Sequence, residues 1–150
     1  MTAPYAHIAV CVEDSPASRR ALAEAVRLRR LGPGRLSIVH AAPWPLLYTG
    51  GLGGWVPDPE DIFAQSRTWL EELAAEIPEA EPVLLTGYPP VAVVEWAEEA
   101  RPDLIVAAAH RGLVDRLLLG SFASYLAYHA PCSVLLVRPE PAREAEAPGG

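Results

Sequence analysis

Short apolar runs alternate with amphipathic stretches along almost the whole chain. Apolar runs bounded by turn residues predict buried strands, and apolar positions recurring every three to four residues predict helices. The predicted strands are residues 7–12, 36–40, 82–86, 103–109 and 133–137. The predicted helices begin at Pro16, at Asp58, after Gly87 and at Ser121. This alternation predicts an α/β protein.

Strands that are apolar on both faces and joined by helices are typical of a parallel sheet covered on both sides. We therefore expect a single doubly wound, mostly parallel five-stranded sheet with helices on both faces. The expected strand order is 3-2-1-4-5, which is flavodoxin-like and Rossmann-like. Residues 1–138 are predicted to form one domain. Residues 139–150 are rich in Pro, Ala, Glu and Gly and are predicted to be a disordered tail.

In a sheet of this order, ligands bind at the switch point between the first and fourth strands. The loops that flank it are residues 13–15 and 110–121, and both carry polar groups. The second loop ends in Gly120-Ser121 at a helix start, where free backbone N–H groups and the helix dipole favour an anion. A simpler interpretation of Ser121 is that it only caps the helix.

Composition narrows the possible functions. The chain has 12 basic and 19 acidic residues, a formal net charge of −7, which argues against binding nucleic acid or anionic lipid. No apolar run approaches the roughly 18 residues that span a membrane, and no signal-peptide pattern opens the chain. We therefore expect a cytoplasmic protein. Cys11 and Cys132 lie in apolar contexts and are predicted to be buried free thiols.

Several residues resemble parts of a chemical site without completing one. His110 and His129 have no acidic partner at ligand spacing, so no metal site is predicted. His40 is interpreted as a hydrogen-bonded edge histidine rather than a catalyst. No nucleophile elbow, Walker motif or dinucleotide fingerprint is present, so no catalytic residue is predicted. The long segment 41–57, with three aromatic residues, could cover a ligand or pack on itself.

Segments spread in order over residues 5 to 138 resemble the universal stress protein family, whose domain has the adenine nucleotide alpha hydrolase-like fold. The most diagnostic is a leucine-rich Gly-Ser turn followed by His-Ala-Pro-Cys. The matching segments are residues 8–15 with Ser18, the strand ending in His40, residues 87–89, residues 103–106 with His110, residues 117–121 and residues 129–137.

The resemblance implies an ATP site built on a Gly-x-x-Gly, nine residues, Gly-Ser/Thr pattern. Gly120 and Ser121 match its last pair, whereas Ala108 takes the place of the first glycine when His110 is aligned. The second glycine has no counterpart. Gly112 could replace its flexibility, and Arg111 and Arg116 could supply charge.

Two further positions follow from the same resemblance. Glu13 replaces an aspartate that faces the ribose and phosphates, and it could still coordinate Mg²⁺. The backbone of Ala41 would face the adenine. The candidate cofactor-binding residues are Glu13, Ser15, Ala41, Ala108, His110, Arg111, Gly112, Gly120 and Ser121.

Two functions from different classes stay open. In the first, ATP, with Mg²⁺, fills the crevice of a stress-response module and changes a surface for an unidentified protein partner. In the second, the crevice binds no nucleotide and the chain is a dimeric interaction scaffold. Enzymatic activity is expected to be at most slow ATP hydrolysis, because no set of base, arginine finger and metal carboxylates can be named.

The last predicted strand suggests an assembly. Residues 133–137 are apolar and contain neither Pro nor Lys, and an unprotected hydrophobic edge tends to be covered or paired. Pairing of this strand across a two-fold axis would satisfy its free backbone groups. The resemblance to universal stress proteins implies the same interface. We therefore expect a homodimer through Ser133 to Val137.

Overall fold

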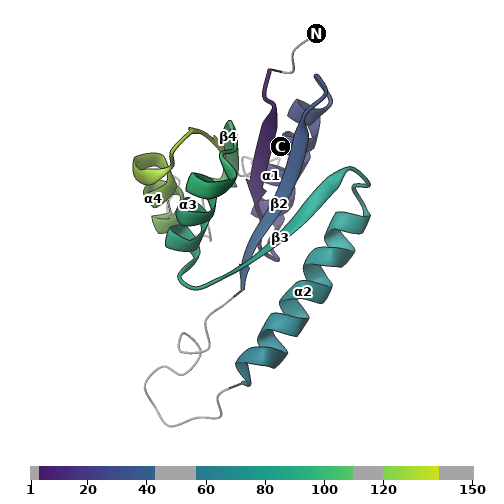
Figure 1. Ribbon diagram of the computed structural model, residues 1–150, viewed down its shortest axis with the longest axis vertical. Coiled ribbons are helices and arrows are strands. Elements are labelled where there is room, and N and C mark those ends of the chain that lie inside the picture. Colours follow the sequence, from purple (N-terminus) through teal and green to yellow (C-terminus); the bar gives the residue numbers. More distant parts are fainter. Residues whose placement is uncertain (1–3, 43–56, 110–119, 139–150) are drawn as a thin grey trace, which may run out of the picture.

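The computed structural model describes residues 4–42, 57–109 and 120–138, and these form one α/β sheet structure (Figure 1). Its sheet has the order β3-β2-β1-β4-β5, and every neighbouring pair is parallel. The predicted fold class and strand order are therefore confirmed. The elements are β1 (His7–Cys11), α1 (Pro16–Arg29), β2 (Arg35–Ala42), α2 (Pro59–Ala75), β3 (Ala80–Thr86), α3 (Pro89–Ala100), β4 (Leu104–Ala108), α4 (Ser121–His129) and β5 (Ser133–Val137).

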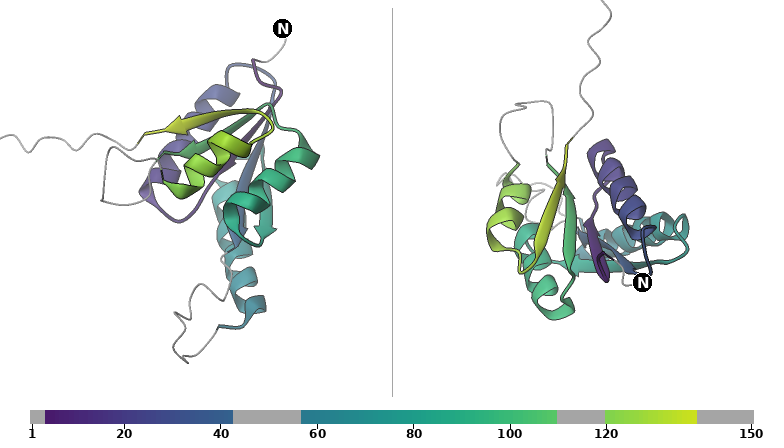
Figure 2. Two further views of the ribbon diagram at one scale, coloured as in Figure 1. Left: turned by 90° about the vertical axis from the view of Figure 1, so that its left-hand side faces the viewer. Right: turned by 90° about the horizontal axis from the view of Figure 1, so that it is seen from above.

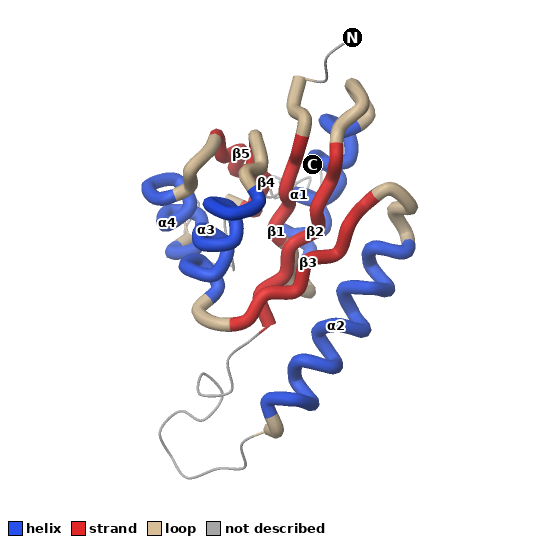
Figure 3. The backbone as a smooth tube through the Cα atoms, in the orientation of Figure 1, coloured by secondary structure: helices blue, strands red, loops and turns tan. Residues whose placement is uncertain are grey.

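Helices α1 and α2 cover one face of the sheet, and α3 and α4 cover the other (Figures 2 and 3). The side chains of Ile8 and Val10 in β1 pack among residues of α1 and α2, while those of Ala9 and Cys11 pack among residues of α3 and α4. This alternation follows from the two-residue period of a strand. All five residues of β1 are buried, because the strand lies at the centre of the sheet between β2 and β4.

Strand β3 begins two residues earlier than the sequence predicts, and it contains a proline. The Val12 N–H donates to the Val39 carbonyl at 2.9 Å, so odd-numbered residues of β2 turn their backbone groups toward β1 and even-numbered ones toward β3. Ile38 is the register partner of Pro82 and therefore bonds to the two neighbours of that proline. Pro82 itself faces the free edge, where a missing N–H breaks no ladder bond.

The helix starts follow local capping chemistry. Ser15 caps α1 by accepting from the Ser18 N–H, with Pro16 at the first helical position, as predicted. Asp58 caps α2 by accepting from the Glu60 N–H at 2.9 Å. Cys11 and Cys132 are both free thiols, but only Cys11 is buried as predicted, and Cys132 is half-buried. Burial raises the pKa of Cys11 to about 12. None of the helices in the described ranges is both long and apolar enough to span a bilayer.

Candidate functional site

The candidate site lies at the C-terminal ends of β1, β2 and β4. After β1 the chain continues into α1 on one face of the sheet, and after β4 it continues to α4 on the opposite face. Two neighbouring strands whose connections diverge in this way leave a crevice between them, which is the switch point of the fold. The predicted location of the crevice is thus consistent with the topology.

The turn between β1 and α1 is closed by its own side chains. The Ser18 N–H donates to Ser15 Oγ at 3.2 Å, and the Glu13 N–H donates to Ser18 Oγ at 2.9 Å. Ser15 Oγ also donates to Glu13 Oε1 at 3.4 Å, so the carboxylate lies beside the turn that carries it. Ser18 is only 4% exposed. Ser18 belongs to the residues that resemble the family, but nothing in the sequence indicates that it is the second member of this cap.

The junction between β4 and α4 is built differently. Gly120 is the N-cap of α4 and contributes no side-chain hydrogen bond to the helix start. The Gly120 N–H donates to the Ala109 carbonyl at 3.3 Å, and the Gly120 carbonyl accepts from the Ser124 N–H at 2.9 Å. The interpretation of Ser121 as the N-cap is therefore wrong: the helical ladder begins at the carbonyl of Gly120, which makes Ser121 the first helical residue.

Ala41 presents backbone groups rather than a side chain. It lies two residues beyond Val39, so its N–H and C=O have the same orientation and are directed to the side of β1. The paired part of β1 ends at Cys11, before this level is reached. A donor and an acceptor on one residue therefore point toward the region where the crevice lies.

His40 closes the end of β1 from the neighbouring strand. Its Nδ1 lies 2.8 Å from the Val12 carbonyl oxygen, and a carbonyl only accepts, so Nδ1 carries the proton. Burial lowers the pKa of His40, opposed by this hydrogen bond and by Glu13. The predicted hydrogen bonding is confirmed, but the description as an edge histidine is wrong, because β2 lies between β3 and β1.

A shallow depression adjoins this end of β1, between α1 and α2. Its lining residues are Val12, Glu13, Ser18, Arg19, Leu22, Trp69 and Leu73. The indole of Trp69 meets the His40 ring edge-on, with ring centroids 4.8 Å apart. Neither Trp69 nor Arg19 is indicated by the sequence as a site residue. Helical spacing is typical of a core position for Trp69, and no pattern in the sequence indicates that it reaches His40.

The described candidates fall on three neighbouring strand ends. Glu13 and Ser15 follow β1, Ala41 is the last residue but one of β2, and Ala108 ends β4, while Gly120 and Ser121 open α4. His110, Arg111 and Gly112 lie outside the described residues, as does Arg116. Within residues 4–42, 57–109 and 120–138, no three His, Cys, Asp or Glu side chains gather as a metal-ligand set. A Mg²⁺ ion at Glu13 would therefore take its further ligands from water or from phosphate oxygens.

Comparison with known proteins gives the family. The model of the universal stress protein family matches residues 4–138. A universal stress protein of Thermus aquaticus is 31% identical over 87% of this chain and 97% of its own length. The universal stress protein A homolog 1 of Coxiella burnetii is 29% identical over 89% of this chain and 96% of its own length.

Solved structures agree with this assignment. The universal stress protein of Archaeoglobus fulgidus in complex with dAMP is 27% identical, with a TM-score of 0.61 over 88% of this chain and 97% of that one. UspA of Lactobacillus plantarum has a TM-score of 0.67 at 23% identity, covering 91% of this chain and 100% of that one. The sequence pattern, the sheet order and the family match together place this chain in the universal stress protein family.

Proposed function

We propose that this chain is a stress-response module that binds an adenine nucleotide in the crevice between β1 and β4. The observation that carries the proposal is the start of α4. There the N-cap is a glycine, so no cap side chain engages the first N–H groups of the helix. Free N–H groups and the positive end of the helix dipole together form an anion site. A phosphate group is the natural occupant.

Ala41 supports adenine as the base. The Watson–Crick edge of adenine offers an acceptor at N1 next to a donor at N6. The N–H and C=O of one residue, facing the same side, match that pair. The relative from Archaeoglobus fulgidus, whose structure contains dAMP, supports the same class of ligand. Glu13 would hold Mg²⁺ together with the phosphates, and the ion would neutralise their charge.

The phosphate cradle departs from the family pattern at Ala108. A Cβ at that position narrows the space available to a phosphate, whereas a glycine leaves the backbone accessible. For this reason we retain the alternative that the crevice binds no nucleotide and that the chain works as a dimeric scaffold. ATP hydrolysis, if it occurs, is expected to be slow, and we assign no catalytic residue.

Calorimetric titration with a graded ligand set tests the nucleotide proposal. ATP, ADP, AMP and adenosine are titrated with Mg²⁺ present. If the start of α4 holds phosphate, ATP should bind at least about tenfold more tightly than adenosine, or about 1.4 kcal/mol. Equal affinities would place the phosphates outside the α4 terminus. If no ligand binds at about millimolar concentration, the binding free energy is weaker than roughly 4 kcal/mol. That result would support the alternative function as a dimeric scaffold.

A second measurement is independent of added ligand. Protein purified without added nucleotide is denatured, and the released small molecules are analysed by mass spectrometry. An adenine nucleotide in near-stoichiometric amount would identify the natural occupant of the crevice. A different released metabolite would keep the site but change the ligand, which the titration series would then show as weak binding throughout.

The free edge of β5 favours the homodimer that the alternative requires. The Ala109 N–H donates to the Val137 carbonyl at 2.9 Å, so odd-numbered residues of β5 face β4. The backbone groups of Val134 and Leu136 therefore face the open edge. Residues 134–137 are aliphatic and half-buried, and no Pro or Lys interrupts them. We propose that this edge pairs with β5 of a second copy.

Light scattering after size exclusion tests the dimer. The chain weighs 16.1 kDa, and the expected species has twice that mass. Leu136→Lys should yield the monomer, because it places a charge at the paired edge. Thr86→Lys, on the opposite edge strand β3, serves as the matched control and should leave the dimer intact. A wild-type monomer, or a dimer that survives Leu136→Lys, would contradict this interface.

A further inference from the structure

The surface of α1 is basic in a chain that is acidic overall. Residues 16–35 contain six of the chain's 12 basic residues and a single acidic residue, Glu24, which gives this segment a net charge of +5. The rest of the chain contains six basic and 18 acidic residues. The arginines exposed on α1 or directly after it are Arg19, Arg20, Arg27 and Arg30. Positive charge is therefore concentrated on one helix.

Helix α2 has the opposite charge. Residues 58–76 contain six acidic residues and a single basic one, Arg67, which gives this segment a net charge of −5. The acidic residues gather near the two ends of the helix and are all exposed: Asp58, Glu60 and Asp61 near its start, and Glu71, Glu72 and Glu76 near its end. The two segments are thus equal and opposite in net charge.

The order of the charges along the two helices is complementary as well. In α1 a half-buried glutamate lies between two exposed arginines, and in α2 an exposed arginine lies between two exposed acidic residues. The two triplets are Arg20, Glu24 and Arg27 in α1, and Asp61, Arg67 and Glu72 in α2. Glu24 pairs with Arg27 at 3.2 Å, but an exposed pair of this kind is weak and can exchange partners.

Both helices cover the same face of the sheet (Figure 2). Helix α1 packs on β1 and β4, α2 packs on β2 and β3, and both line the depression between them. By helical spacing, Arg20 and Arg27 lie on the side of α1 opposite its buried residues. Asp61 and Glu72 lie in the same way on α2. The outer surface of this face therefore has a positive half and a negative half next to each other.

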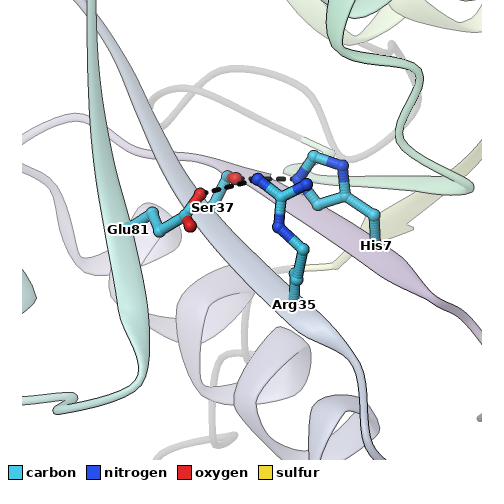
Figure 4. A network of polar contacts seen from close by, with 4 residues as sticks. All are labelled: His7, Arg35, Ser37 and Glu81. Carbon is cyan, nitrogen blue, oxygen red and sulfur yellow. Dashed lines mark hydrogen bonds and ion pairs between the residues drawn. The ribbon is translucent and has the colours of Figure 1, made fainter.

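Ion pairs within the chain balance only part of the charge. Arg29 pairs with Glu79, which follows α2, and Arg35 at the start of β2 pairs with Glu81 on β3 at 2.9 Å (Figure 4). Within residues 4–42, 57–109 and 120–138, no ion pair is made by Arg19, Arg20 or Arg30. The outward charge of α1 is thus not balanced by the described part of the chain.

We propose that this face binds the same face of a second copy of the chain. Both helices connect parallel strands, so they run in the same direction and their N-termini lie at the same end of the sheet. A two-fold axis that runs between the helices, along their length, places α1 of each copy on α2 of the other in an isologous contact. The charge order of α1 then meets its complement twice. The contact includes neither the start of α4 nor the edge of β5, so it is compatible with either function considered above.

A second copy fits this face better than a uniformly charged partner does. An acidic protein or a polyphosphate would be attracted by α1 and repelled by α2 next to it. A partner must therefore carry both signs in the matching arrangement, as a second copy does. Exposed ion pairs are individually weak and are screened by salt. The association is therefore expected to be reversible and to depend strongly on ionic strength.

Sedimentation equilibrium at two salt concentrations measures the contact. The full chain is compared at about 10 mM salt, where charges act over about 30 Å, and at about 1 M salt, where they act over about 3 Å. The species that persists in high salt is the reference, and its mass should double in low salt. The overall charge of −7 predicts the reverse trend, because salt screens the repulsion between like-charged molecules.

Charge reversal on each helix identifies the contact. Arg20→Glu/Arg27→Glu reverses α1, and Asp61→Arg/Glu72→Arg reverses α2. Each variant alone should weaken the low-salt association at least about tenfold, because like charges then meet. An equimolar mixture of the two variants should restore it, because each reversed helix then meets its complement. The α2 variant has a net charge of −3 in place of −7, since each reversal adds two positive charges, so general repulsion cannot explain its loss.

A matched control reverses two exposed acidic residues on the other face of the sheet. Glu95→Arg/Glu98→Arg on α3 makes the same change of net charge as the α2 variant and should associate like the wild type. Circular dichroism verifies the fold of each variant. If a reversed variant does not fold, Arg20→Gln/Arg27→Gln takes its place and should show a smaller loss of association in the same direction.

Three results would overturn the proposal: a mass that is the same in low and high salt, a mixture of reversed variants that does not associate, or an equal loss in the α3 control. Poly-glutamate is the probe for a different occupant. If it binds a wild-type chain that does not self-associate in low salt, α1 is a surface for an acidic partner, and the contact between copies is wrong.

Discussion

Helices α1 and α4 both begin at the crevice, but their N-termini are completed in different ways. At α1, Ser15 and Ser18 satisfy the backbone of the turn from within. At α4 the N-cap is Gly120, which has no side chain to do so. The start of α1 is thus capped by its own side chains, whereas the N-cap residue of α4 contributes no side-chain hydrogen bond. Under the proposed function, this difference decides which of the two termini holds the phosphate.

The largest expected effect comes from placing a side chain at the N-cap of α4. Gly120→Val should lower nucleotide affinity at least about 100-fold, or about 2.7 kcal/mol, because the Cβ and two methyl groups occupy the phosphate path. Gly120 has φ −57°, which valine adopts without strain, so the variant should fold. Calorimetry gives the affinity and circular dichroism the fold. Unchanged affinity in the folded variant would move the phosphate site away from α4.

A substitution at the capped N-terminus of α1 should change the free energy of unfolding and not the nucleotide affinity. Ser18→Ala removes the buried acceptor of the Glu13 N–H and should lower the free energy of unfolding by about 2 kcal/mol. Urea unfolding measures the change. Thr68→Ala is the control, because Thr68 makes only an exposed bond to the Ala64 carbonyl within α2. Equal losses of unfolding free energy in the two variants would show that the Ser18 hydrogen bond at the α1 cap contributes no more than the exposed Thr68 bond.

Ser121→Asp should separate binding from stability at the open terminus. A carboxylate in the first turn of α4 interacts favourably with the helix dipole and should stabilise the fold by about 0.5 kcal/mol. The same charge repels a phosphate and should weaken nucleotide binding about tenfold, or about 1.4 kcal/mol. Thermal unfolding and calorimetry on one sample give both values. A simultaneous gain in stability and affinity would exclude an anion at this position.

The smallest effect is expected at the N-cap of α1. Ser15→Ala should lower the free energy of unfolding by about 1 kcal/mol, the usual cost of losing a serine cap. Nucleotide affinity should change little, although the Glu13 carboxylate loses one hydrogen-bond donor. Urea unfolding checks the first expectation and calorimetry the second. A drop in affinity as large as that of Ser121→Asp would show that both termini hold the ligand.

Most of the fold could be predicted because its signals are local. The five strands are short apolar runs, and the starts of α1 and α2 carry a capping residue followed by proline. The early start of β3 was missed, because Ala80 and the exposed Glu81 do not belong to the apolar run that predicts the strand. The description of His40 as an edge residue failed although the predicted strand order already placed its strand between two neighbours.

The candidate site was predictable in its location and less so in its detail. Strand ends and helix starts can be located from the sequence, so Glu13, Gly120 and Ala41 could be named. The contact between His40 and Trp69 joins residues from two elements that are 29 positions apart, and helical spacing alone assigns Trp69 to the core. The cap of α4 at Gly120 depends on a backbone hydrogen bond, and sequence preference alone favoured serine.

The proline on β3 limits how many copies the sheet can recruit. Backbone groups on the outer side of β3 are interrupted at Pro82, whereas those of β5 form an unbroken row. If two chains join through β5, both ends of the continuous sheet are then β3 strands that resist a further neighbour. In the proposed dimer, assembly through the sheet edges would therefore stop at two copies and would not continue into a fibre.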